Sequence, residues 1–99
     1  MNTSNNETKE NKMKISNMLS SNGKKIANQF TIENELGDTF FQSYDTIIAK
    51  MSKGNVYLDE NKWNYSTTTG KYRNLFLNET KNETELKIKS GEYTLINLN

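Results

Sequence analysis

The stretch KIANQFTIENELGDTFFQSY, residues 25–44, decides the fold that the sequence predicts. Between residues 25 and 33 the side chains alternate with a period of two, as in a half-buried β-strand. One face of this strand carries Ile26, Asn28, Phe30 and Ile32, and the other carries Ala27, Gln29 and Thr31. Residues 34–38 have the composition of a loop, and residues 39–44 are rich in β formers. We therefore predict a β-hairpin over residues 25–44.

The segments before this hairpin are less apolar. Residues 1–12 contain no apolar side chain after Met1, which predicts a disordered tail and leaves residues 13–99 as a single domain. Ile15, Met18 and Leu19 have helical spacing, so we expect about two turns of helix that end at Asn22-Gly23.

After the hairpin, residues 46–51 (TIIAKM) fit either a short helix or a buried strand. A turn at residues 52–55 and a short strand at residues 56–58 should follow. Ser66 or Thr67 is a suitable N-cap for a helix that places Tyr72, Leu75 and Phe76 on one face.

Thr80 and Glu83 match the capping box of a second helix, with Gly91 as its C-terminal stop. The alternation of Leu86 and Ile88 also allows a hairpin that turns at Ser90-Gly91. Residues 93–98 should form the last strand. The fold class is therefore α+β: a small antiparallel sheet of about four strands with two or three short helices packed on one face.

The composition excludes several kinds of chemistry. The 99 residues are 32% hydrophobic and contain neither cysteine nor histidine. A disulfide, a thiol nucleophile, a histidine base and a Cys/His zinc site are all impossible. We therefore expect a protein that is not an enzyme and has no cofactor and no metal site. The net charge of +1 confines any electrostatic site to a local patch.

Hydropathy points to a cytoplasmic protein. No apolar run approaches the roughly 20 residues that a membrane span needs. The N-terminal MNTSNNETKENK lacks the apolar core of a signal peptide. We therefore predict no membrane partner.

Residues 62–77, KWNYSTTTGKYRNLFL, are the densest candidate for a binding site. The segment TTTGKY lacks the first glycine and the final Ser/Thr of a phosphate-binding P-loop. Its hydroxyls can cap a helix or, with Lys71 nearby, form a simpler anion site. Cations interleave with aromatic rings here, as in surfaces that bind single-stranded nucleic acid or form protein hot spots. The predicted binding residues are Lys62, Tyr65, Lys71, Tyr72 and Arg73.

Some side chains of residues 62–77 should be buried and others exposed. Trp63 and Phe76 are expected to pack in the core, and Lys71 and Arg73 to be exposed. A weaker candidate lies nearby, because Asp45 with Glu60-Asn61-Lys62 is similar to the acidic–lysine pattern of metal-dependent nucleases. That pattern is common by chance, and residues 59–61 also suit a polar turn.

Four segments carry a resemblance to a known group of proteins: QFTIEN, GDTFFQSYDTIIA, VYLDENKWNYSTTTGKYRNLFL and KSGEYTLINLN. They resemble an uncharacterised family of small proteins encoded by phages and conjugative plasmids of low-GC Gram-positive bacteria. The resemblance covers residues 29–99 and supplies no catalytic residues. It implies a mobile-element protein that binds and inhibits a host defence complex stoichiometrically, in the manner of an anti-CRISPR protein. The partner would be a host protein or nucleoprotein complex such as a CRISPR effector nuclease.

The second hypothesis is a nucleic-acid-binding accessory or regulatory protein that uses the same aromatic and basic surface.

Overall fold

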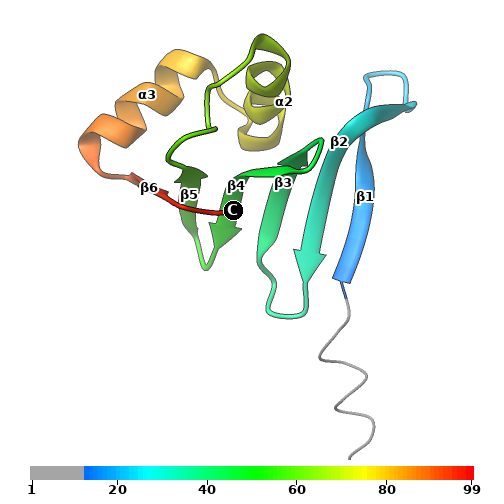
Figure 1. Cartoon of the computed structure of the whole chain (residues 1–99), viewed down its shortest axis with the longest axis horizontal. Helices are drawn as coiled ribbons and strands as arrows, with labels where there is room; N and C mark the ends of the chain where they lie inside the picture. Colours follow the sequence, from blue (N-terminus) through cyan, green and yellow to red (C-terminus); the bar gives the residue numbers. More distant parts are fainter. Residues whose placement is uncertain (1–12) are drawn as a thin grey trace, which may run out of the picture.

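The computed structural model describes residues 13–99, so the predicted tail at residues 1–12 lies outside the described residues. One six-stranded sheet and two helices make up the described chain (Figure 1). Along the chain these elements are β1 (Met13–Leu19), β2 (Lys25–Asn34), β3 (Thr39–Ser43), β4 (Thr46–Ser52), β5 (Asn55–Asp59), α2 (Thr67–Leu77), α3 (Lys81–Ser90) and β6 (Tyr93–Ile96). The α+β class is confirmed.

The sheet has more strands than the sequence predicts. Strands β1 to β5 follow one another as an antiparallel meander, and β6 pairs with β5 in parallel. A parallel pair needs a long crossover, and here the chain that contains both helices provides it. The prediction of a purely antiparallel sheet of about four strands is therefore wrong in both details.

The helix predicted from Ile15, Met18 and Leu19 is wrong, because these residues form strand β1. Over so short a segment, the spacing of these residues fits both the helical period and the strand period. Pairing with β2 selects the strand. Gly23, with a φ of 83°, forms the tight turn that joins the two strands. The predicted helix stop at Asn22-Gly23 is thus the turn of a hairpin.

Strand β2 departs from simple alternation at Asn28, which has a φ of 64°. The register with β1 also shifts between Asn17 and Leu19, so an irregularity interrupts the ladder here. Gln29, the residue after this irregularity, is buried and lies on the face opposite Phe30 and Ile32, as the alternation predicts. The strand itself and its hairpin with β3 are confirmed.

The ambiguous segment 46–51 is strand β4, and the turn at residues 52–55 joins it to β5 as predicted. A register shift opposite Phe41 and Gln42 leaves one extra residue in β4. Ile48 and Ala49 are both fully buried next to this shift. The extra residue thus lets two consecutive side chains contribute to the core.

Both helices begin and end at the residues that their capping signals indicate. Ser66 caps α2 and accepts a hydrogen bond from the Thr69 backbone N–H at 3.1 Å. Thr80 and Glu83 form the complete capping box of α3, and Gly91 ends it with a φ of 86°. The alternative hairpin over residues 80–93 is therefore excluded. In the described residues no helix is long and apolar enough to span a membrane.

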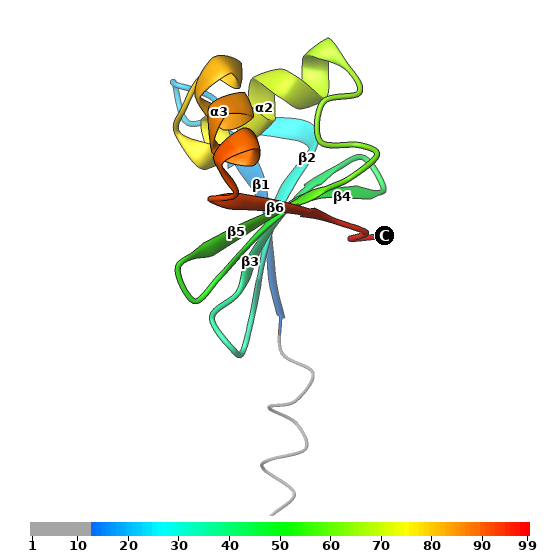
Figure 2. The same ribbon diagram turned by 90° about the vertical axis from the view of Figure 1, so that its left-hand side faces the viewer.

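The core lies between the helices and one face of the sheet. Buried apolar side chains from β3, β4 and β5 meet α2, where the rings of Phe41 and Phe76 stack with centroids 5.8 Å apart. Trp63 also packs against this core, so the inward orientation predicted for Trp63 and Phe76 is confirmed. Both views show the two helices together at the same end of the molecule (Figures 1 and 2), and Figure 1 shows the outer strand β1 on the side away from α3.

Candidate binding surfaces

A buried side chain of α2 fixes the start of this helix against the sheet. Thr69, which is buried in the first turn, forms a hydroxyl–hydroxyl hydrogen bond with Ser43 of β3 at 3.1 Å. This contact places the N-terminus of α2 against the end of β3. The side chains of the preceding loop are thereby brought next to the middle of the helix.

Arg73 is the largest fully buried side chain among the described residues, with an exposed fraction of 1%. Its Nη1 donates to the Trp63 carbonyl oxygen at 2.8 Å and to Asn64 Oδ1 at 3.1 Å. Its Nη2 donates to Asn74 Oδ1 at 2.9 Å. The guanidinium therefore ties the loop before α2 to the helix. The prediction that Arg73 is exposed is wrong, because the loop carbonyl and amide oxygens give this side chain partners inside the fold.

No carboxylate contacts the Arg73 guanidinium within residues 13–99. Burial lowers its pKa, and the more distant charges of Glu79 and Glu85 oppose this effect. Glu79 is already engaged, since it accepts from Lys87 Nζ at 2.7 Å and from the Tyr93 hydroxyl at 2.8 Å. Arg73 is thus a buried positive charge that the fold solvates with neutral oxygens.

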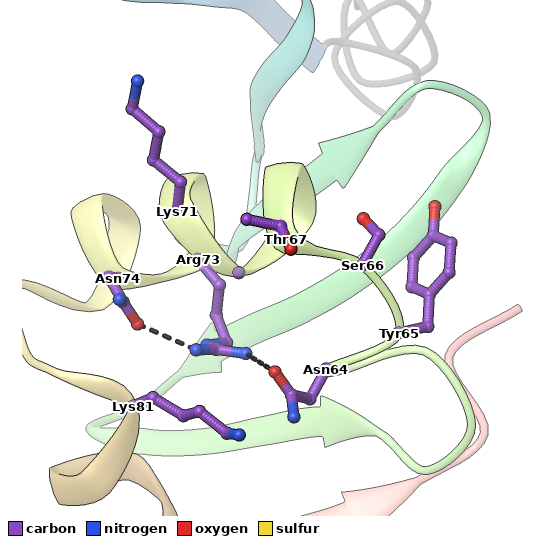
Figure 3. A pocket seen from close by; sticks show the side chains of 9 residues that line it. Asn64, Tyr65, Ser66, Thr67, Lys71, Arg73, Asn74 and Lys81 are labelled. Atoms are coloured by element: carbon purple, nitrogen blue, oxygen red, sulfur yellow. Dashed lines mark hydrogen bonds between the residues drawn. The ribbon is translucent and has the colours of Figure 1, made fainter.

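A shallow pocket of about 640 Å³ opens over the guanidinium (Figure 3). Lys81, the first residue of α3, extends its side chain beside Arg73, whereas Lys71 points away from it. Gly70 forms part of the wall, and a Cβ there would lie 3.7 Å from Arg73 Nη2. Three cations and no acidic residue line the pocket, which comprises Asn64, Tyr65, Ser66, Thr67, Gly70, Lys71, Arg73, Asn74 and Lys81.

The other predicted site residues are divided between the surface and the core. Lys62 Nζ lies 4.9 Å from the centre of the exposed Tyr65 ring, at the edge of the loop. Lys71 is exposed as predicted, with its Nζ 5.4 Å from the centre of the Tyr72 ring. Tyr72 is half-buried against the core. The structure thus brings Tyr65, Lys71 and Arg73 to one pocket, and leaves Lys62 and Tyr72 outside its lining.

A second surface lies on the side of the sheet opposite the helices. Five side chains form one row across adjacent strands, because each is the register partner of the next: Ile15, Ile32, Phe40, Lys50 and Tyr57. Phe40 precedes the core residue Phe41 in β3, so it faces away from the helices. Lys50 Nζ lies 5.6 Å from the centre of the Phe40 ring and 5.8 Å from that of Tyr57. We call these five residues the open-face row.

The open-face row continues onto an uncovered edge. Among residues 13–99, strand β1 is outermost in the sheet and has a strand neighbour on one side only (Figure 1). Ile15 has an exposed fraction of 64%, and Met13 and Leu19 on the same side of β1 are also exposed. The described helices make their main contacts with β3, β4 and β6, and Met18 is the only buried residue of β1.

Asp59, next to the residues of the acidic–lysine pattern, has a structural role. Asp45, Asp59 and Lys62 do line a common pocket, but Glu60 does not. Both Asp59 oxygens accept hydrogen bonds, from the backbone N–H groups of Asn61, Lys62 and Leu98 and from the Asn99 side chain. Burial would raise the pKa of Asp59, and these hydrogen bonds lower it below its usual value. Residues 13–99 contain no group of three acidic side chains placed to hold a metal ion.

The fold and the two surfaces define a small α+β protein with a basic pocket beside α2 and the open-face row on the other side of the sheet. The chain belongs to a family of unknown function, DUF8033, which matches residues 13–92. No curated protein and no solved structure matches the chain.

Sequence reasoning missed Lys81, Asn64 and Asn74 in the pocket and all of the open-face row. Lys81 could not be found because it comes from a separate helix. A sequence signal for β1 was present in the alternation of Met13, Ile15 and Leu19, although it competed with the helical spacing.

Proposed function

We propose that this protein is a non-catalytic binder that docks onto a protein partner through β1 and the open-face row. The main support is the exposure of Ile15 at the edge of the sheet, where its register partners Ile32 and Phe40 continue an apolar row. An outer strand with an uncovered apolar face is a template for contact with another chain. A monomer of this size would otherwise keep such a surface in water at a cost in solubility.

The composition of this surface favours a protein partner over a polyanion. Lys50 is the only charge in the row, and Asp38, which precedes β3, has its carboxylate 3.4 Å from Asn34 Nδ2. The cores of protein interfaces are depleted in charge and enriched in aromatic side chains. Phe40 and Tyr57, with Lys50 between their rings, match this composition.

We extend the proposal to the partner suggested by the resemblance to mobile-element proteins. The partner is a host protein or nucleoprotein complex of a defence system, such as a CRISPR effector nuclease, and binding inhibits it stoichiometrically. Support for this step comes from the chain's resemblance and from a surface suited to docking.

The test is capture from a lysate of a Gram-positive host with the tagged chain and two matched variants. Ile15→Lys places a charge in the open-face row, and Leu36→Lys places the same charge in a turn where the leucine is 81% exposed. We expect Ile15→Lys to reduce specific capture at least about tenfold and Leu36→Lys to retain it. Equal capture by both variants contradicts the proposed surface.

Inhibition is tested by titrating the chain into a purified nuclease complex. The proposal predicts that activity falls linearly and ends at a fixed molar ratio. Complete inhibition by a small fraction of an equivalent indicates turnover, which contradicts a non-catalytic mode of action.

A further inference from the structure

We infer that the pocket over Arg73 binds a backbone phosphate of single-stranded nucleic acid, with an adjacent base on the Tyr65 ring. This site is separate from the open-face row, because its residues come from the loop before α2, from α2 and from the start of α3. The inference therefore does not depend on the proposed protein partner.

The buried positive charge of Arg73 has no carboxylate in contact with it among residues 13–99. A guanidinium has five N–H donors, and only three hydrogen bonds engage them here, all to neutral oxygens. Arg73 Nε has no hydrogen-bond partner in the described part of the chain, although it is buried. A buried cation without a counter-ion is costly, and an anion in the adjoining pocket would offset this cost.

The surroundings of Arg73 favour an anion. Lys81 lies beside the guanidinium, and the Asn64 and Asn74 amide oxygens point at Arg73, as Figure 3 shows for all three side chains. The amide nitrogens of the two asparagines are then directed away from Arg73 and can donate as well. Because no carboxylate lines the pocket, an anion that enters it meets donors and positive charge without like-charge repulsion.

The rim of the pocket favours a nucleic acid strand over an isolated anion. Tyr65 is 45% exposed and lies in the pocket lining, where its ring can stack with a base. Lys62 beside this ring and the outward-pointing Lys71 provide further charges at the edge. A strand with regularly spaced phosphates and planar bases uses all of these groups, whereas an acidic peptide leaves the tyrosine without a stacking partner.

Gly70 is consistent with this role. It is a buried glycine in the interior of α2, where its φ is not positive and no turn requires it. A side chain here would extend over the guanidinium, since its Cβ would lie within 3.8 Å of Nη1, Nη2 and Asn64 Oδ1. The missing Cβ leaves space in the pocket wall next to the Arg73 guanidinium.

The test is fluorescence anisotropy of a labelled oligothymidylate with the full chain at about 50 mM salt. Lys81→Ala removes the pocket charge, and Lys89→Ala removes the same charge from the exposed far end of α3. We expect Lys81→Ala to bind about tenfold more weakly and Lys89→Ala to bind like the unaltered chain. Arg73 is not substituted here because it also holds the loop before α2.

Two further measurements distinguish a nucleic acid from other anions as the ligand of this pocket. Tyr65→Leu should weaken binding of the oligonucleotide, while competition by inorganic phosphate should be the same for Tyr65→Leu and the unaltered chain. Polyglutamate should displace the oligonucleotide poorly. Equal affinity of Lys81→Ala and Lys89→Ala, or no binding at this salt concentration, overturns the site. Displacement by polyglutamate as effective as by unlabelled oligonucleotide overturns the choice of nucleic acid and indicates an acidic protein segment.

Discussion

The guanidinium of Arg73 lies 5.2 Å from the centre of the Trp63 ring and donates a hydrogen bond to the Trp63 carbonyl oxygen at 2.8 Å. One side chain in the middle of α2 thus holds the backbone of a loop ten residues earlier in the chain. The same charge forms the floor of the only pocket lined by both Lys71 and Lys81, among the pockets described for residues 13–99. Stability and binding are therefore linked at Arg73, and variants must separate them.

Arg73→Met should destabilise the fold by about 2 kcal/mol, because it leaves the Trp63 carbonyl oxygen without its donor while it removes the buried charge. Urea denaturation measures the change in free energy of unfolding. Lys71→Met on the exposed side of α2 is the matched control and should stay within about 0.5 kcal/mol. A neutral or stabilising Arg73→Met would show that the buried charge costs more than its three hydrogen bonds contribute.

Gly70→Ala should have opposite effects on stability and binding. Alanine at a helix-interior position stabilises by about 0.5–1 kcal/mol, and the added Cβ finds ordinary contact distances. The same methyl group narrows the approach to Arg73, so oligonucleotide affinity should fall. Thermal denaturation and anisotropy measure the two effects, and a rise in both stability and affinity is the contradictory result.

Glu79 makes the fold sensitive to acid. Burial would raise its pKa, but hydrogen bonds from Lys87, Thr84 and Tyr93 hold the pKa below the ordinary value of 4.5. The unfolded chain therefore binds a proton at higher pH than the folded protein does, so this stabilisation is complete above about pH 4.5 and is lost as the pH falls further.

Glu79→Gln should flatten this acid-dependent loss of stability between about pH 6 and pH 3, as measured by urea denaturation. The Glu92→Gln variant removes the same charge from an exposed position and serves as the control. Part of the loss should persist in Glu79→Gln, because Asp59 also has a lowered pKa in the folded state. An unchanged pH profile in Glu79→Gln argues against this role of the Glu79 cluster.

Ser66→Ala should cost about 1 kcal/mol of stability, since the hydroxyl satisfies the Thr69 backbone N–H at the start of α2. Thr67→Ala changes an exposed neighbouring hydroxyl that caps no backbone group, and it should have little effect. Circular dichroism during thermal unfolding provides the comparison. Equal losses in both variants would mean that the cap is not the source of the stability.

Local signals predicted the parts of the fold that local chemistry decides. The capping box of Thr80 and Glu83 and the stop at Gly91 defined α3, because cap geometry depends on residues a few positions apart. Strand β1 was missed because Ile15 adopts a strand through its pairing with Ile32, seventeen positions later. The parallel pairing of β6 with β5 likewise depends on contacts across the whole helical crossover.

The sequence predicted the segment that contains the pocket, but not the burial of its residues. Tyr65, Lys71 and Arg73 were identified by residue type, yet the burial of Arg73 ran against the usual exposure of arginine. The fully buried residues of α2 are Thr69, Gly70 and Arg73, while Phe76 packs against the core and Leu75, predicted on the same face, is 55% exposed. The apolar spacing therefore does not mark the buried positions of this helix. The buried position of Arg73 is recognised only when the loop oxygens that solvate it are known.

Docking through β1 and the open-face row can be followed by hydrogen–deuterium exchange on the chain alone and in the complex captured from the host lysate. We expect slower exchange of the β1 amides at residues 13–19 in the complex, with unchanged exchange in the turn at residues 35–37. Unchanged exchange in β1, with protection confined to other parts of the chain, would contradict it.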